Sequence, residues 1–180
     1  MEKFQVERLE SLSETDLFDL CEATDAAILD GGGFGFVSPP ERNWLERYWQ
    51  GVLLVPERSL FVARREGTIC GSVQMVAPPR NNEAQKSIVA VQHLFVAPWA
   101  RGLGVGRLLM KAAEAEAKTR RFKVINLDVR ETQTQAIAMY EGLGYQRWGL
   151  HPKYAHVRGN WVPGIYFFKD VPPAGKRRNG

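Results

Sequence analysis

The sequence predicts a single-domain α/β protein, in which about four helices flank a mixed sheet of about six to seven strands. Three observations support this fold class. Strand-like and helix-like segments mix along the chain, with a hairpin first and crossover connections after it. The segment 87–97 is apolar on both faces, as in a sheet covered on both sides. The 180 residues, 44% hydrophobic and 24% charged, are enough for one buried core.

The first helix is expected to run from Ser13 to about Leu29. The Ser13 hydroxyl can cap the first turn, and Asp16 places a negative charge near the positive end of the helix. The glycines at 31–33 then end the helix. They open the segment "DGGGFGF", which we expect to be a flexible, aromatic-bearing loop on the substrate side.

The second helix is expected to begin at "SPPE" and to end at Gly51. Ser38 would be the N-cap, Pro39 would take the first helical position, and Glu41 would close a capping box.

Strands dominate the next part of the chain. Segments 59–65 and 68–76 form a predicted hairpin around Glu66 and Gly67, and a polar loop leads to the strand at 87–97. The remaining elements are a helix from about residue 105, a strand at 123–129, a helix at about 133–143, and strands from 145 and at 165–169. The helix from residue 105 is amphipathic, with Glu114 and Lys118 expected to pair on its outer face.

The charge of the chain is concentrated at its C-terminus. Of the formal net charge of +4, three positive charges come from Lys176, Arg177 and Arg178. We therefore expect a domain at 1–170 and a flexible basic tail at 171–180, and we do not expect nucleic acid binding by the nearly neutral body. A modifier directed to nucleic acid by the tail stays open as an alternative.

The sequence also bears on location and metal binding. It has no apolar run long enough to span a bilayer, and its first residues lack the pattern of a signal peptide, so we expect a cytoplasmic protein that binds no membrane. Cys21 and Cys70 form no metal-binding or disulfide pattern, and both are expected to be buried. No metal site is predicted.

The segment "APWARGLGVGRLLM", residues 97–110, carries the clearest functional signal. Closely spaced glycines between a strand and a helix let backbone N–H groups approach an anion at the positive helix end, which favours a phosphate cradle. It is not a dinucleotide fingerprint, because Arg107 stands three residues after Gly104, and no Walker lysine is present. A tight turn without a ligand is the structural alternative.

The glycines follow the pattern R-x-x-G-x-G, and "FVAPWARGLGVGRLLM" resembles the pyrophosphate-binding motif of the GCN5-related N-acetyltransferases. The segment "LDVRETQTQAIAMYEGLGY", 127–145, is similar to the second signature of that family. The resemblance covers roughly 59–148 and implies a GNAT-like fold with a partly splayed sheet and acetyl-CoA as co-substrate. It implies coenzyme contacts at Leu94, Phe95, Val96, Arg101, Gly102, Leu103, Gly104, Val105, Gly106, Arg107, Gln133 and Tyr140.

Within that set the resemblance gives each part a role. The N–H groups of 103–106 and the side chain of Arg101 or Arg107 would hold the pyrophosphate, and pantetheine would lie along 94–96. A bulge in the strand would free a backbone N–H, that of Leu94, to bond the thioester carbonyl. Tyr140 matches a tyrosine close to the coenzyme sulfur and would donate a proton or hydrogen bond to the thiolate. Gln133 stands where an asparagine is frequent.

The general base is not given by the resemblance. The strand positions that often carry a glutamate or histidine match Ala90 and Gln92. Strand alternation should turn His93 to the opposite face as a core histidine, unless the bulge rotates it. Asp128 could attract the substrate ammonium or relay its proton through water, or it could be only a solvated or paired carboxylate.

The acceptor is expected to be a small primary amine, contacted by Gln92, Asp128 and Tyr154. The segment "HPKYAHVRGNW", 151–161, should surround its groove together with "DGGGFGF", Trp44 and Tyr48. Trp44 and Tyr48 are also an i,i+4 pair on an amphipathic helix, which more often indicates core packing than a binding wall. The leading hypothesis is direct acetyl transfer in a ternary complex. The alternative is a coenzyme A-binding regulatory or sensor domain without turnover, and a homodimer is left open.

Overall fold

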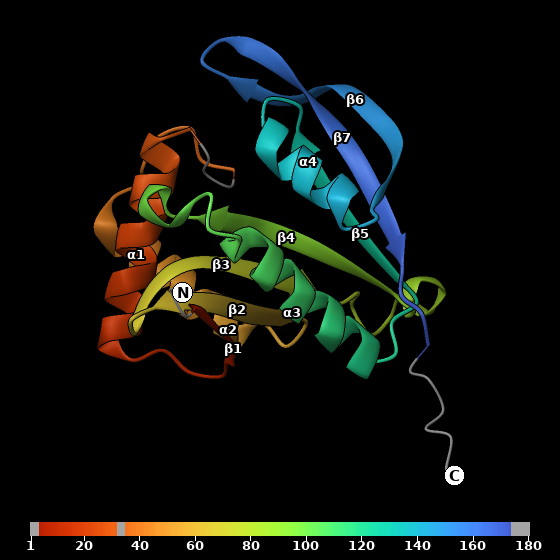
Figure 1. Ribbon diagram of the computed structural model, residues 1–180, viewed down its shortest axis with the longest axis horizontal. Coiled ribbons are helices and arrows are strands. Elements are labelled where there is room, and N and C mark those ends of the chain that lie inside the picture. The colour runs from red at the N-terminus through yellow and green to blue at the C-terminus, as the bar shows by residue number, and fades with distance from the viewer. Residues whose placement is uncertain (1–3, 32–34, 174–180) are drawn as a thin grey trace.

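The computed structural model describes residues 4–31 and 35–173. In this part of the chain the strands form one seven-stranded sheet in the order β1-β2-β3-β4-β5-β7-β6 (Figure 1). The strands are β1 (Phe4–Leu9), β2 (Arg58–Arg65), β3 (Thr68–Val76), β4 (Ile88–Val96), β5 (Val124–Arg130), β6 (Gln146–Val157) and β7 (Asn160–Asp170). The helices are α1 (Glu14–Leu29), α2 (Arg42–Leu54), α3 (Val105–Thr119) and α4 (Thr134–Gly142).

The predicted mixed and splayed sheet is confirmed. Strands β4 and β5 are parallel and pair only from Ile88 opposite Val124 to Ala90 opposite Asn126, whereas the other neighbours are antiparallel. Past Ala90 the two strands separate, and this opening divides the sheet into two halves. Any groove between the halves is therefore lined by the later residues of β4 and β5.

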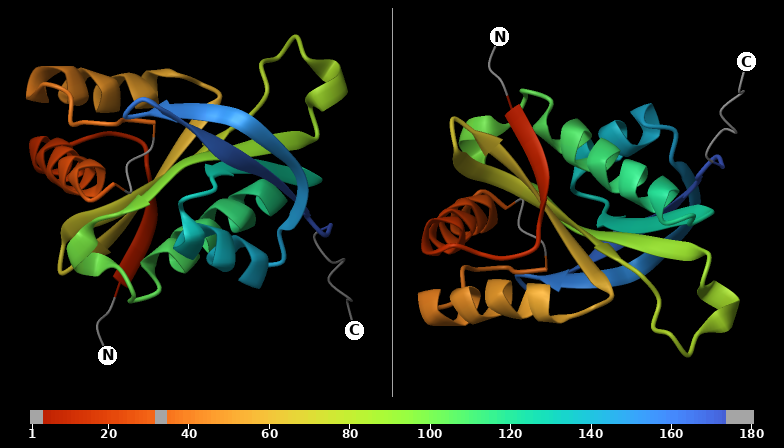
Figure 2. Two further views of the ribbon diagram at one scale, coloured as in Figure 1. Left: turned by 90° about the horizontal axis from the view of Figure 1, so that it is seen from above. Right: turned by 90° about the horizontal axis from the view of Figure 1, so that it is seen from below.

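Helices cover both faces of the sheet (Figure 2). On one face α1 and α2 bury Leu20, Leu45 and Trp49 against the sheet. On the other face α3 and α4 form a second apolar cluster that contains Leu109 and Ile137. Successive residues of β2 alternate between the two clusters, with Leu60 and Val62 on one face and Phe61 and Ala63 on the other, so this strand is a continuous apolar run in the sequence.

Three local predictions are confirmed. Ser13 caps α1 through a 3.1 Å hydrogen bond from the Asp16 N–H, and the Asp16 carboxylate accepts from the Ser13 N–H in return. The hairpin turns at 66–67 as expected. Cys21 and Cys70 are buried free thiols, and burial raises the pKa of Cys21 to about 11, which keeps it an unreactive thiol.

The predicted start and end of the second helix are wrong. Helix α2 has Glu41 as its N-cap, no side chain caps it, and its first residue is Arg42. Arg42 is held there by Glu22 of α1, at 2.6 Å, and by Glu46. At the other end the helix continues through Gly51 because the next residue, Val52, is buried against the sheet. A glycine costs only about 1 kcal/mol inside a helix, so packing outweighs it.

Two further features depart from the sequence analysis. Strand β1 was not expected; it pairs with β2 at the edge of the sheet, and of its residues only Leu9 is fully buried. The predicted pair of Glu114 and Lys118 is replaced by a 2.9 Å ion pair between Glu114 and Lys169 of β7. Lys169 lies where helix and sheet meet, so the pair is less solvated than a pair along the helix surface.

The C-terminal tail was predicted at 171–180. The Val171 N–H still donates to the Lys123 carbonyl, at 2.8 Å, so the ordered part extends beyond 170. Residues 174–180 lie outside the described residues, as do 32–34 of the predicted loop. Among the described helices, none is both long and apolar enough to cross a lipid bilayer.

Candidate active site

A β-bulge in β4 determines which side chains face the site. Ser72 lies opposite Phe95 and Gln74 lies opposite Gln92, so His93 and Leu94 together face the single residue between Ser72 and Gln74. His93 has a φ of 54°, a left-handed conformation that is uncommon outside glycine. The expected bulge in this strand is therefore present, at the residues where it was placed.

The bulge changes which face each later residue of β4 occupies. Val91 packs in the cluster under α3, and after the extra residue it is Leu94 and Val96 that pack against this cluster. Phe95 turns to the cluster under α1 and α2. Without the bulge, His93 would share the face of Val91 and lie in the core.

His93 instead lines a cavity, so the expectation from simple strand alternation is wrong. Its ring centroid lies 6.4 Å from that of Tyr48 of α2. Burial and the positive charge of Arg58 lower the pKa of His93 to about 4, and the nearby charge of Asp128 offsets this only in part. His93 is therefore a neutral imidazole at pH 7.

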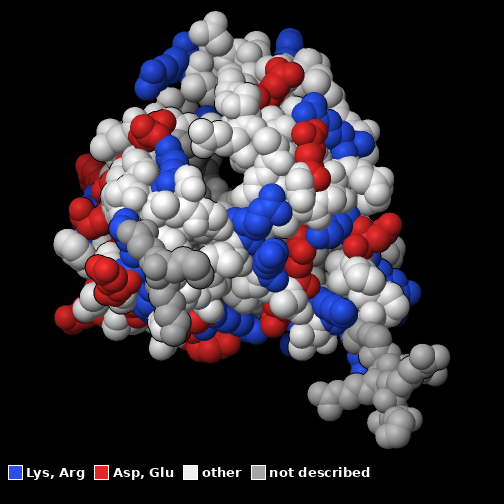
Figure 3. All heavy atoms as spheres, in the orientation of Figure 1, with Lys and Arg blue, Asp and Glu red and all other residues white. Residues whose placement is uncertain are grey.

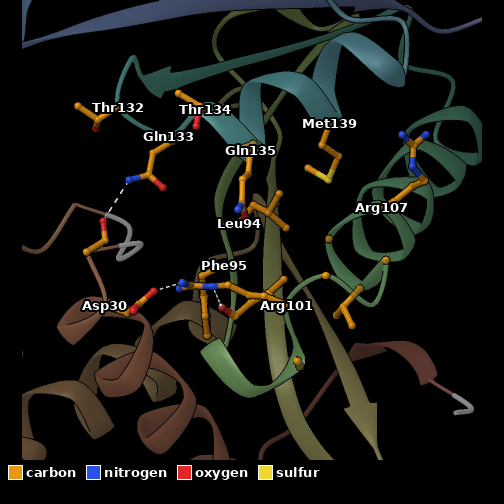
Figure 4. Close-up of a pocket in the computed structure, with 18 residues that line it drawn as sticks. Asp30, Leu94, Phe95, Arg101, Arg107, Thr132, Gln133, Thr134, Gln135 and Met139 are labelled. Atoms are coloured by element: carbon orange, nitrogen blue, oxygen red, sulfur yellow. Dashed lines mark hydrogen bonds and ion pairs between the residues drawn. The ribbon is translucent and has the colours of Figure 1, made fainter.

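A first cavity, of about 720 Å³, lies at the N-terminus of α3, between the end of β4 and the start of α4 (Figure 4). Gly104 is the N-cap of α3 and has a φ of 81°, and Gly102 has a φ of 74°. This left-handed backbone is one that glycine adopts at little cost. The first N–H groups of α3 have no partner within the helix, so they and the helix dipole favour an anion there.

Most of the predicted coenzyme contacts come together around this cavity. Leu103 is not among its lining residues and has an exposed side chain, and Tyr140 lines the neighbouring cavity instead. The predicted residues that line the first cavity are Leu94, Phe95, Val96, Arg101, Gly102, Gly104, Val105, Gly106, Arg107 and Gln133.

Close packing is a second reason for a glycine at position 106, and the sequence motif did not reveal it. A Cβ at this position would lie 3.1 Å from the sulfur of Met139, on α4. The missing side chain thus lets α3 and α4 approach closely on one side of the cavity. Gly104 differs, because a Cβ there would meet no protein atom within 4 Å and only its φ demands glycine.

The two arginines of the motif already have protein partners. The Arg101 Nε donates to the Val96 carbonyl at 3.0 Å, and its Nη1 forms an ion pair with Asp30 at the end of α1 (Figure 4). Arg107 extends from α3 toward α4, where its Nη1 donates to the Gly142 carbonyl at 3.4 Å. Arg101 is thus held at the edge of the cavity, and Arg107 at the C-terminal end of α4.

Gln133 occupies the N-cap position of α4, but its side chain does not cap the helix. Its Nε2 instead donates to the Gly31 carbonyl at 3.1 Å (Figure 4). The amide therefore joins α4 to the segment that follows α1, and both residues line the cavity.

A second cavity, of about 550 Å³, adjoins the first where β4 and β5 separate. The two cavities share Leu94, Gln133 and Ala136 as lining residues. In Figure 3 the surface is deeply hollowed near the centre of this face. The predicted acceptor residues Gln92, Asp128 and Tyr154 all line the second cavity, together with Tyr140.

Tyr140 is a buried tyrosine among the residues that line this second cavity. The residue is 5% exposed, and its ring packs against those of Tyr145 and Phe167, each with a centroid distance of 5.9 Å. Burial raises the pKa of Tyr140 well above its usual value, and the negative charge of Asp128 raises it further. The phenol therefore stays protonated near neutral pH and can act as a donor.

Asp128 is held by Tyr154, a contact that the sequence did not predict. The Tyr154 hydroxyl donates to the Asp128 carboxylate, which joins β6 to β5 across the cavity. This position of the ring depends on Gly164 of β7, because a Cβ there would lie 2.1 Å from the Tyr154 ring. Burial and Asp128 raise the pKa of Tyr154, so its hydroxyl remains a donor.

The predicted groove segment 151–161 contributes only part of its residues. His156 lines the second cavity, whereas the Nδ1 of the exposed His151 accepts a 3.1 Å bond from the Lys153 N–H. Tyr48 accepts a bond from the buried Gln74 and stacks on Trp44 at 5.8 Å. Tyr48 packs against the apolar cluster under α1 and α2, as the core-packing alternative had it, whereas Trp44 is 44% exposed.

Arg130 is a charged residue of the second cavity that the sequence analysis missed. The signal was available, because Arg130 stands two positions after Asp128 on the same strand and so shares its face.

Comparison with known proteins agrees with this geometry. The Acetyltransferase (GNAT) family model matches residues 23–145. An uncharacterized N-acetyltransferase of Azospirillum brasilense is 57% identical over 128 residues, which are 71% of this chain and 76% of the relative.

Solved structures share the fold at low sequence identity. An N-acetyltransferase from Staphylococcus aureus Mu50 has a TM-score of 0.80 at 14% identity, and the match covers 94% of this chain and 99% of the Staphylococcus chain. A phosphinothricin acetyltransferase from Sinorhizobium meliloti in complex with acetyl-CoA has a TM-score of 0.75 at 19% identity, covering 93% and 88%. The family match spans more than half of the chain, and the glycine cradle and the bulged strand lie where the motifs require them. The chain therefore belongs to the acetyltransferase (GNAT) family, enzymes that use acetyl-CoA as co-substrate.

Proposed function

We propose that this protein transfers the acetyl group of acetyl-CoA to the primary amine of a small molecule, by direct attack in a ternary complex. The observation that carries this proposal is the junction of the two cavities at Leu94. A coenzyme in the first cavity and an amine in the second would meet at the bulge. No covalent enzyme intermediate is then required.

The residues present fit acetyl-CoA. The first cavity has a glycine backbone and a helix N-terminus at one side for the pyrophosphate, with Arg101 beside it. Leu94 to Val96 offer a strand edge for pantetheine, because β5 has separated from β4 at this point. The β-bulge at His93 and Leu94 interrupts the pairing of β4 with β3. This interruption supports the assignment of the Leu94 N–H as the donor to the thioester carbonyl.

When bound, acetyl-CoA supplies a thioester; the amine nitrogen bonds to its carbonyl carbon, the C–S bond breaks, and the products are an N-acetyl amine and coenzyme A thiol. An ammonium carries three protons and the nitrogen of the amide product carries one, so the nitrogen loses two protons; the sulfur gains one, and the other is released to solvent. Tyr140 is the proposed donor to sulfur, since its phenol stays protonated. Asp128 is the proposed group that attracts the ammonium and receives its proton directly or through water.

The division of labour between Asp128 and His93 can be tested. Asp128→Asn removes a negative charge beside the amine, so we expect kcat/KM to fall by about 10²-fold and its pH profile to change. Because the pKa of His93 is about 4, His93 does not titrate near neutral pH, and His93→Gln should leave the profile in place. The measurement is kcat/KM from pH 6 to 9. The reverse result would make His93, which the bulge turns into the cavity, the base.

The function itself is tested by thiol release from acetyl-CoA across a panel of primary amines. We expect turnover above the hydrolysis background with at least one amine, and mass spectrometry should find its N-acetyl product. One observation favours the rival function, a coenzyme A sensor: β4 carries Ala90 and Gln92 where many relatives carry a base. Tight acetyl-CoA binding without thiol release for any amine would support the sensor and refute the enzyme.

A further inference from the structure

Opposite charges lie on one face of β5, inside the second cavity. Asp128 and Arg130 both line this cavity, and Val129 between them lines it while packing against the core in which Ile125 and Leu127 are buried. Side chains two positions apart on a strand point to the same side, with Cα atoms about 6.6 Å apart. A ligand lying along β5 would therefore meet a carboxylate first and a guanidinium one strand repeat later.

Asp128 identifies the end of the cavity where the amine must lie. Its charge raises the pKa of both Tyr140 and Tyr154, so the carboxylate is close to the proposed proton donor and to the second tyrosine. The positive charge of Arg130 acts on Tyr154 with the opposite sign and offsets a small part of this rise in its pKa. The guanidinium thus contributes positive charge to the acceptor cavity, on the same face as Asp128.

The wall opposite β5 adds a second, independent observation. The β6–β7 hairpin supplies Tyr154, Ala155, His156 and Val157 to the cavity lining. From residue 142 to residue 169 the sequence has no Asp or Glu. Of the basic residues in this stretch, Arg147 and Lys169 form ion pairs with Glu141 and Glu114, whereas Lys153 stands next to Tyr154. The hairpin beside the cavity therefore adds no carboxylate that would repel an anionic ligand, and Lys153 adds a positive charge next to Tyr154.

We propose that the acceptor is an amino acid or a close analogue, an amine that carries a carboxylate near its nitrogen, and that Arg130 determines this specificity. The ammonium lies at Asp128, and the carboxylate lies at Arg130, whose planar guanidinium can bind both oxygens. The remaining lining includes Val37, Val91, Ala155 and Val157, which suits an apolar side chain. This inference rests on the proposed function, and it adds the class of substrate.

The test compares matched acceptors that differ only at the carboxylate: leucine against 3-methylbutylamine, and phenylalanine against 2-phenylethylamine. We expect kcat/KM for the amino acid to exceed that for the decarboxylated amine by at least about 10²-fold, with most of the difference in KM. Leucinamide, which keeps the shape but not the charge, should behave like the decarboxylated amine. O-Phosphoethanolamine is added to the panel as an amine with a phosphate.

The variant that tests Arg130 is Arg130→Gln, with Arg130→Lys as the conservative change. The ratio of kcat/KM between leucine and 3-methylbutylamine should fall to within about tenfold of one in Arg130→Gln, and it should be partly retained in Arg130→Lys. Arg158→Gln is the matched control, because Arg158 lies in the β6–β7 turn and does not line the cavity. The control should keep the wild-type ratio.

Different failures have different meanings. If no amine of any kind is acetylated, the proposed function fails. If the decarboxylated amines are acetylated as well as the amino acids, only the carboxylate inference is overturned. A preference for O-phosphoethanolamine would overturn it in favour of a phosphate. An Arg130→Gln variant that loses both activities equally would make Arg130 a structural residue and would also overturn the inference.

Discussion

Replacing Gly104 with valine is expected to abolish acetyl-CoA binding while the far-ultraviolet circular dichroism stays native. Gly104 has a φ of 81° at the N-cap of α3, a conformation that a β-branched residue adopts only under strain. The strain shifts the backbone N–H groups that would meet the pyrophosphate, and the new side chain lies beside them. Losing two charge-assisted hydrogen bonds costs about 3 to 6 kcal/mol, so the Kd should rise by about 10² to 10⁴-fold.

Gly67→Val is the matched control for this experiment. Gly67, in the β2–β3 turn, has a φ of 89°, and a Cβ there would also meet no protein atom within 4 Å. It suffers the same kind of backbone strain, but it does not line the coenzyme cavity. Calorimetry should find unchanged acetyl-CoA affinity for this control. Unchanged affinity in Gly104→Val would refute the cradle, and equal loss in both variants would point to general destabilisation.

Replacing Tyr140 with phenylalanine is expected to lower kcat and kcat/KM together by about 10²-fold. A donor to the departing sulfur acts in the transition state, so its loss should leave the acetyl-CoA Kd nearly unchanged. Phenylalanine keeps the ring contacts with Tyr145 and Phe167, so the free energy of unfolding should change little. The measurements are kcat with an amine that shows turnover, and the Kd of acetyl-CoA for the same protein.

Tyr145→Phe is the control for the Tyr140 variant. Tyr145 is 3% exposed and packs against Tyr140, but it lines neither cavity. It should keep the wild-type kcat. An unimpaired kcat in Tyr140→Phe would reduce Tyr140 to a packing residue, and a defect confined to coenzyme affinity would make it a cofactor contact.

The site could be predicted in part because some of its signals are local in the chain. The glycines of 102–106 stand between a strand and a helix, and neighbouring residues alone determine that such a turn presents N–H groups to an anion. The sequence motif identified Gly106 but did not show that close packing also requires a glycine there. That requirement comes from Met139, which lies on α4, a helix that begins far along the chain.

The acceptor side was less predictable because its geometry depends on pairing between distant segments. His93 was assigned to the core by simple alternation, and the bulge against β3 moved it into the cavity. The bond from Tyr154 to Asp128 requires β6 to fold back over Gly164 and reach β5. Neither the face that His93 occupies nor the bond between Tyr154 and Asp128 could be predicted from residue spacing.

The sequence by itself determined the α/β class, the Ser13 cap, the β2–β3 hairpin and the glycine turn that begins α3. These features depend on residues within a few positions of one another, where propensity and turn chemistry act directly. The tertiary structure alone decided where the sheet splays, which face His93 occupies and which partner Glu114 takes. It also brought Asp128, Arg130 and Tyr154 into one cavity. The reason is that strand register and helix packing are set by burial across the whole sheet, and a shift of one residue reverses the face of every side chain after it.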